Sequence, residues 1–176
     1  MSTRKVAKSV RGYRSLHKYI GLSLGIILVI SAVTGILLAW KKQSDVIQPP
    51  TLKGETTDAS LYAPVDQMVE KAALAVDSLG LSTSNLDRLE YRATKGIAKA
   101  IFDTGNWEVQ IDAKTLEVLS VAKRHSDWIE QLHDGSIISE LFKITSMNIL
   151  GLGLLFLVCS GLWLWYGPKK IRKLKN

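Results

Sequence analysis

The sequence predicts a membrane protein with an α-helical hairpin of two transmembrane helices. A small α+β extracytoplasmic domain lies between the two helices in the sequence. Two observations predict this fold class. Residues 19–40 and 144–167 contain no charged side chain, and each segment reaches the length of about 20 residues that a helix needs to cross a bilayer. The residues between the two segments are polar and place hydrophobic side chains at helix and strand spacing, which is typical of a folded domain outside the membrane.

The charges lie unevenly around the two apolar segments. All 16 acidic residues fall within 41–143, which also holds 12 basic residues and so has a net charge of −4. The two tails, 1–18 and 168–176, hold the other 11 basic residues and no acidic residue. Because an excess of Lys and Arg beside a span marks the cytoplasmic side, we expect both termini in the cytoplasm of a bacterium and the central domain in the periplasm. Contact of the tails with the lipid bilayer explains the basic balance without nucleic acid.

The first span, residues 19–40, is predicted to be an uncleaved signal-anchor in the inner membrane. Its apolar run is longer than the about 7–15 residues of a cleaved signal peptide, and no small-x-small cleavage site follows it. The single cysteine, Cys159, lies in the second span, so the central domain contains no disulfide bond.

The central domain is predicted to begin after a linker, residues 41–60, and to occupy residues 61–122. Pro64 opens an amphipathic helix that ends at Gly80. Alternating hydrophobic residues then predict two β-hairpins, with turns at Lys95-Gly96 and at Asp112-Ala-Lys-Thr115. An amphipathic juxtamembrane segment, 123–143, leads into the second span, 144–167.

Several motifs in these elements resemble those of a known family. Arg14-Ser-Leu-His17-Lys-Tyr-Ile-Gly21, continuing to Thr34-Gly35-Ile-Leu-Leu, is similar to the first helix of the PepSY-associated transmembrane family. Leu132-His133-Asp-Gly135 and the later Ser160-Gly-Leu-Trp-Leu-Trp are similar to its last helix, and Trp107-Glu-Val-Gln-Ile-Asp-Ala-Lys-Thr-Leu is similar to the close of a PepSY domain. Larger members, described as iron-regulated membrane proteins, have four or more spans, whereas this chain has two.

The resemblance implies haem b as a cofactor, because some larger members act as haem-containing ferric-siderophore reductases. His17 and His133, each in a Leu-His motif before a span, are then the expected axial ligands of haem iron. His17 begins a helix face of small residues on which a porphyrin or a second helix backbone can approach closely. The alternatives are a packing face that begins with an interfacial histidine at His17, and a surface histidine at His133. The third histidine, His125, is expected to be exposed or interfacial.

The two candidate ligands lie at opposite ends of a span, roughly 35 Å apart at 1.5 Å per residue, so they cannot bind the same iron. A bis-histidine haem therefore needs a second ligand from another chain. A homodimer with its two-fold axis along the membrane normal pairs His17 with His17 and His133 with His133. A larger membrane-protein complex is the other source of second ligands.

Two functions remain open at this stage. One is haem-mediated transmembrane electron transfer, linked to reduction of ferric iron or a ferric siderophore, with a ferric chelate as a possible partner at the extracytoplasmic face. The other is a non-enzymatic PepSY module that acts as an accessory or regulatory subunit of a protease or of a larger respiratory complex, using an exposed strand edge. The sequence has no dinucleotide-binding glycine motif and no Cys-x-x-Cys pair, so we assign no catalytic residue and leave enzymatic activity open.

Overall fold

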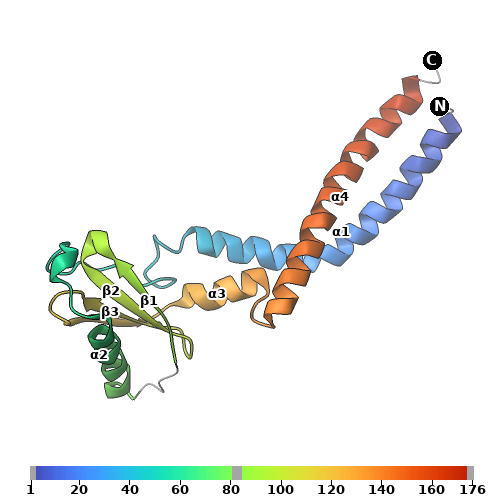
Figure 1. Ribbon diagram of the computed structural model, residues 1–176. Coiled ribbons are helices and arrows are strands. Elements are labelled where there is room, and N and C mark those ends of the chain that lie inside the picture. Colours follow the sequence, from blue (N-terminus) through green and yellow to red (C-terminus); the bar gives the residue numbers. More distant parts are fainter. Residues whose placement is uncertain (1–2, 81–84, 174–176) are drawn as a thin grey trace. The chain divides into compact units, whose positions relative to one another are not determined.

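The computed structural model of the chain describes residues 3–80 and 85–173 (Figure 1). The chain divides into two compact units. Residues 1–35 together with 131–176 form a helical unit, and residues 36–130 form an α+β unit. The predicted fold class, two long apolar helices with a small sheet between them in the sequence, is confirmed.

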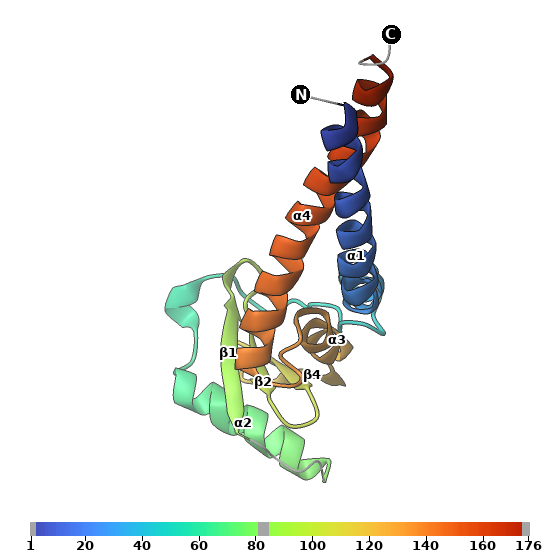
Figure 2. The same ribbon diagram turned by 90° about the vertical axis from the view of Figure 1, so that its right-hand side faces the viewer.

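Two long helices build the helical unit, α1 (Thr3–Ala39) and α4 (Glu140–Lys173). They run antiparallel and side by side (Figures 1 and 2). Both are long and apolar enough to cross a membrane, and most of their large hydrophobic side chains face outward rather than into the unit. Such outward-facing apolar surface is what a helix needs when lipid surrounds it. Both helices continue into the predicted basic tails, of which Lys175 lies outside the described residues.

The contact between α1 and α4 repeats every seven residues. On α4, small residues occupy the repeating positions Gly153, Ser160 and Gly167, which face Leu24, His17 and Val10 of α1. Gly167 lies against Val10 and Gly153 against Leu24, so closely that a methyl group on either glycine would overlap the facing side chain. A seven-residue repeat keeps one seam of each helix turned toward its neighbour, and small residues allow the two backbones to approach.

The small-residue face predicted on α1 takes part in this packing only in places. Gly21 faces Leu157, and Gly35 faces His133. Gly25 has no neighbouring atom within 4 Å of the position that a Cβ would occupy, and Ala32 is exposed. Among the described residues, the small residues of α4 therefore face the other helix more regularly than the small residues of α1, which the sequence predicted as the packing face.

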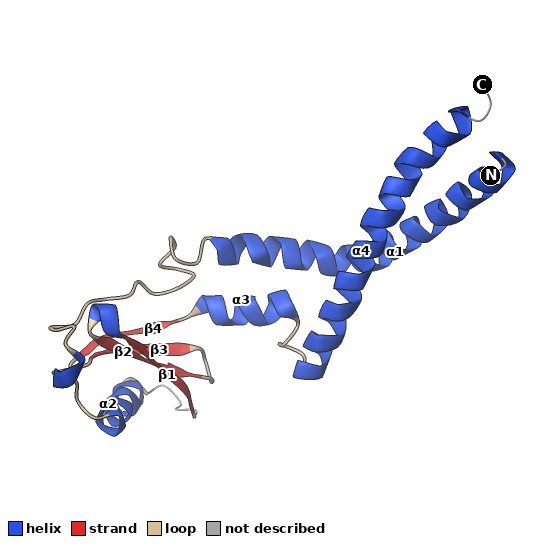
Figure 3. Ribbon diagram, turned by 45° about the horizontal axis from the view of Figure 1, so that its top comes forward, coloured by secondary structure: helices blue, strands red, loops and turns tan. Residues whose placement is uncertain are grey.

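A four-stranded antiparallel sheet forms the centre of the α+β unit, with the order β1-β2-β3-β4. Its strands are β1 (Leu86–Arg92), β2 (Ile97–Phe102), β3 (Trp107–Asp112) and β4 (Val118–Lys123). The predicted amphipathic helix is α2 (Val65–Ser78), which covers one face of the sheet (Figure 3). Ala72 and Val76 of α2 pack there against Ala100, Val109 and Ile111, because alternate strand residues point to the same face.

The opposite face of the sheet is polar yet buried. The side chains of Lys99, Glu108 and Gln110 are each at most 1% exposed. The segment predicted as a linker, residues 41–60, supplies part of the cover: Gln110 accepts from the Leu52 amide and donates to the Pro50 carbonyl, both within 2.9 Å. This segment is therefore hydrogen-bonded along the domain, a role that its Pro- and Thr-rich composition did not indicate.

A short helix, α3 (His125–Asp134), precedes the second span. Gly135 follows it with a φ of +84°, a left-handed conformation that glycine adopts without strain, and α4 begins only at Glu140. The second span therefore does not extend back to His133 as one continuous helix. Lys143 pairs with Glu140 at 3.8 Å and with Asp134 at 3.0 Å.

Candidate functional site

His17 packs against α4 at a Ser-Gly pair. Its Nδ1 lies 2.7 Å from the Ser160 hydroxyl oxygen. The Ser160 hydroxyl also lies 3.1 Å from the Leu157 carbonyl oxygen. When Ser160 donates to that carbonyl, it accepts from a proton on His17 Nδ1, and the lone pair then lies on Nε2. Gly161 lies beside Cε1 of the imidazole ring, so no side chain crowds the ring at that point.

His133, in the last turn of α3, repeats this arrangement against α1. Its Nδ1 lies 3.0 Å from the Thr34 hydroxyl, and Thr34 donates its proton to the Ile30 carbonyl at 2.7 Å. With the Thr34 proton donated to Ile30, the His133 proton lies on Nδ1 and the lone pair on Nε2. Gly35 lies beside the ring, and the His133 carbonyl accepts from Ser31 at 3.3 Å.

The two arrangements have the same chemical form. Each histidine of a Leu-His motif meets a hydroxyl residue followed by glycine, Ser160-Gly161 in one case and Thr34-Gly35 in the other. A hydrogen bond from Nδ1–H to a fixed acceptor holds the tautomer and the ring orientation that a metal-binding Nε2 requires. Among the described residues, neither Nε2 has a hydrogen-bond partner.

The two histidines lie at different levels of the helical unit. His133 is beside Thr34, which follows His17 by 17 residues along α1. At 1.5 Å per residue this corresponds to about 25 Å, less than the roughly 35 Å expected from a full span. The distance is shorter because His133 packs against the side of α1 rather than beyond its end. It still prevents both histidines from binding one iron.

The surroundings of both histidines are mainly apolar. A cavity of about 150 Å³ adjoins His133 and is lined by Ile27, Leu132, Phe142, Met147 and other side chains of α1 and α4. Near His17, Ser160 lines a wider surface pocket together with Tyr13 and Phe156, whose rings stack with centroids 6.3 Å apart. Apolar and aromatic walls with a small number of polar groups are typical of small-molecule and cofactor sites.

The turn after His133 is fixed by Asp134. This carboxylate accepts from the Ser136 amide at 2.9 Å and pairs with Lys143. Burial acts to raise the pKa of Asp134, but the bonds from Ser136 and Lys143 outweigh it and lower the pKa. The ionised Asp134 thus stabilises the connection that positions His133.

The other chemistry-bearing residues do not join these two sites. His125 is exposed and accepts from Trp128 at 3.3 Å, which confirms the expected exposed position. Within residues 3–80 and 85–173, no three His, Cys, Asp or Glu side chains gather as they do around a metal ion. Among these described residues, each of the two sites holds one imidazole.

Residues 14–175 match the model of the PepSY-associated TM region. The chain belongs to this family. The match includes both Leu-His motifs, both hydroxyl–glycine pairs and the whole α+β unit, which confirms the resemblance seen in the sequence. Curated proteins contain no match to the chain.

The sequence analysis missed the hydroxyl partners Ser160 and Thr34. Their signal was present, since both motifs contain the same small pair, Ser-Gly or Thr-Gly, within an apolar helix. A hydroxyl in a span usually bonds to its own helix, so only the packing of α1 with α3 and α4 distinguishes these two as histidine partners.

Proposed function

We propose that this PepSY-associated membrane protein binds haem b through His17 and His133 and transfers electrons across the bacterial inner membrane. Haem would supply one-electron chemistry at both sites. The observation that carries the proposal is the matched contact: at each histidine Nδ1 lies within 3.0 Å of a hydroxyl oxygen, and a hydroxyl that accepts there leaves the lone pair on Nε2. Reduction of ferric iron, as a chelate at the periplasmic face, is the reaction that this transfer serves.

The level of each histidine favours two separate haem sites. His17 and His133 lie about 25 Å apart along the helical unit, so they cannot serve the same haem. Each chain would therefore supply one nitrogen ligand to each of two sites. In a homodimer, the same residue of a second copy completes each pair of ligands. A partner membrane protein with histidines at the same levels serves equally well.

The chain's own residues have three tasks in this proposal. His17 and His133 provide the ligating nitrogens, and Ser160 and Thr34 hold the imidazole rings in one tautomer. Gly161 and Gly35 leave the ring edges uncrowded. Apolar side chains of α1 and α4 line the cavity beside His133 and the surface pocket beside Ser160.

Absorption spectra of the detergent-purified full chain test the proposal, recorded oxidised and then reduced with dithionite. We expect a Soret band and reduced bands of a bis-histidine haem in the wild type. His17→Ala and His133→Ala are each expected to lose part of the band, while His125→Ala, at an exposed site outside the helical unit, serves as the matched control. A colourless wild-type protein produced with ample haem would contradict the proposal.

A second function is favoured by the sheet itself. β1 and β4 are its edge strands, and an edge can accept a strand from another protein. In this case the chain is an accessory or regulatory subunit of a protease or a larger membrane complex. A colourless, folded chain that co-purifies with such a partner, and loses it when Pro replaces Glu90 in β1, would support this second function.

A further inference from the structure

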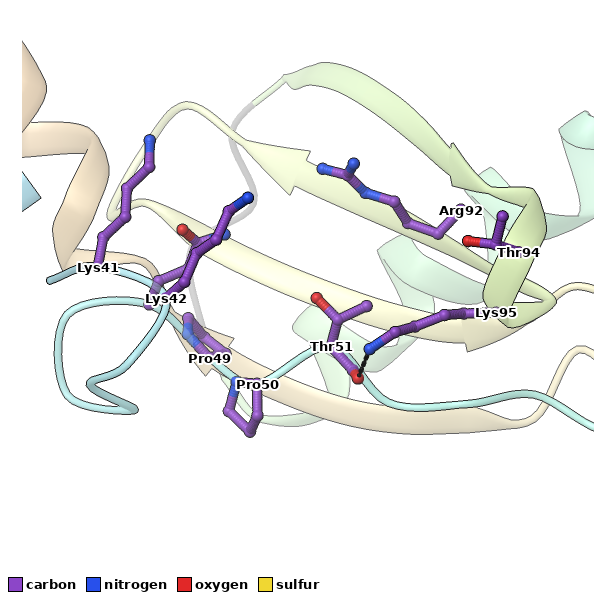
Figure 4. Close-up of a pocket in the computed structure, with 9 residues that line it drawn as sticks. Lys41, Lys42, Pro49, Pro50, Thr51, Arg92, Thr94 and Lys95 are labelled. Atoms are coloured by element: carbon purple, nitrogen blue, oxygen red, sulfur yellow. Dashed lines mark hydrogen bonds between the residues drawn. The ribbon is translucent and has the colours of Figure 1, made fainter. Parts of the chain in front are cut away.

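A pocket of about 510 Å³ opens on the α+β unit where three segments meet. Lys41 and Lys42 follow α1, Thr51 belongs to the segment that crosses the sheet, and Arg92 to Lys95 form the connection between β1 and β2 (Figure 4). Four of the lining residues are basic, and no acidic residue lines the pocket. This concentration is unexpected in a region, residues 41–143, whose net charge is −4.

Hydrogen bonds between the segments hold the walls in place. The Lys95 ammonium donates to the Thr51 carbonyl at 2.6 Å, and the Gly54 amide donates to the Lys95 carbonyl at 2.8 Å. Gly96, with a φ of +66°, lets the backbone of Thr56 approach where any side chain would collide. The pocket therefore exists before a ligand arrives, which lowers the entropic cost of binding.

The cations of the pocket are only partly neutralised. Arg92 pairs with Glu90 at 2.7 Å, and Lys41 lies 3.9 Å from Glu130. Lys42 has no carboxylate partner among the described residues, and the partner of Lys95 is a neutral carbonyl. Figure 4 shows the side chains of Lys42 and Arg92 extending toward the same space between the crossing segment and β1. Like charges placed this way repel, and an anion between them removes the repulsion.

We propose that this pocket binds a phosphate-class oxyanion. Arg92 supplies a planar pair of N–H donors, Lys42 a mobile ammonium and Thr94 a hydroxyl, the donor set that suits a tetrahedral anion. Lys42 is three residues beyond Ala39, so it lies within about 10 Å of the last residue of α1. A lipid phosphate at the membrane surface and free phosphate in solution present the same chemistry here. The inference does not depend on haem.

One arm of the test uses inorganic phosphate and the full chain in an uncharged detergent. Broadening of the ³¹P resonance reports binding. The double variant Lys42→Gln/Arg92→Gln is expected to weaken it about three- to tenfold, since each exposed charge contributes modestly. Lys53→Gln is the matched control, because Lys53 is an exposed lysine of the same segment that does not line the pocket.

The second arm adds lipid to the same protein and counts bound molecules by native mass spectrometry. If the source is a headgroup, phosphatidylglycerol is retained by the wild type and by Lys53→Gln, phosphatidylcholine less so, and the double variant loses the preference. Circular dichroism of the double variant confirms that it is folded. Absence of binding in both arms, or binding that the folded double variant keeps in full, would overturn the proposal.

Discussion

At each histidine of the helical unit, the position of a single hydroxyl proton decides which ring nitrogen carries the lone pair. Ser160 and Thr34 each lie within hydrogen-bond distance of a carbonyl of their own helix, and donation to that carbonyl makes them acceptors toward His17 and His133. The Leu-His motifs of the sequence predicted both histidines as candidate ligands. They did not predict the hydroxyl partners, because hydrogen bonds between helices depend on the register of packing and not on spacing along one helix.

Removal of either hydroxyl should weaken haem retention without removing the ligand. We expect Ser160→Ala and Thr34→Ala each to reduce haem affinity about tenfold, the lower end of what second ligand-sphere substitutions cost. Haem titration of the purified variants measures this. Ser23→Ala is the control, since Ser23 is exposed on α1 and bonds only to the Tyr19 carbonyl. Equal affinity in Ser160→Ala, Thr34→Ala and Ser23→Ala would show that the hydroxyls do not position the rings.

Glu108 belongs to a buried ion cluster on the sheet face that the segment 41–60 helps to cover. This position makes Glu108 critical to the stability of the α+β unit. Its carboxylate accepts from Lys99 at 2.8 Å and from Arg124 at 2.7 Å. Glu108→Ala leaves the buried Lys99 without its carboxylate and Arg124 with Asp127 alone, and we expect a loss of about 3–5 kcal/mol. Hydrogen exchange of β3 amides in the full chain measures the loss. The exposed Glu117→Ala should change protection little, and a similarly small effect of Glu108→Ala would contradict this view of the cluster.

Acid should loosen the turn between β3 and β4 through Asp112. Burial acts to raise its pKa, but amide donors from Thr115, Glu55 and Lys114 outweigh burial and lower it. A lowered native pKa adds stability above the unfolded value of about 3.9 and loses it as pH falls through the native value. Asp112→Asn should therefore cost stability at neutral pH and flatten the acid limb of the unfolding profile. An unchanged acid limb in this variant would argue against Asp112 as its source.

At the scale of elements, the seven-residue repeat of small residues on α4 sets how closely α1 and α4 approach. Gly153 faces Leu24, whereas Gly151, two residues earlier, has no neighbouring atom within 4 Å of a Cβ position. The sequence predicted both spans from their apolar length. It did not identify the α4 stripe, since glycine and serine at one position in seven are inconspicuous in an apolar helix.

This difference yields a matched pair of substitutions. Gly153→Ile inserts a branched side chain between the helices and should destabilise their pairing by about 1–3 kcal/mol. Gly151→Ile adds the same side chain toward open space and should change stability little. Thermal unfolding of both variants in detergent compares them. If the two variants lose the same stability, the glycine seam does not determine the pairing.

For the whole molecule, hydrophobic length, charge asymmetry and strand alternation were sufficient to predict two apolar helices and a helix-plus-sheet domain. The same signals did not indicate how the segment 41–60, which composition presents as a linker, bonds to the sheet. Its hydrogen bonds with Gln110 and Lys95 join residues far apart in the sequence, and a local pattern carries no information on such pairs. The basic pocket arises in the same way, since Lys42 and Arg92 are 50 positions apart.

Haem quantified per chain tests whether each chain ligates iron at two levels. A homodimer that shares two haems between two chains gives about one haem per chain. His17→Ala and His133→Ala should each retain about half of that amount, and the double variant none, while His125→Ala keeps it all. Haem absent from the wild type, or present undiminished in the double variant, would contradict the account.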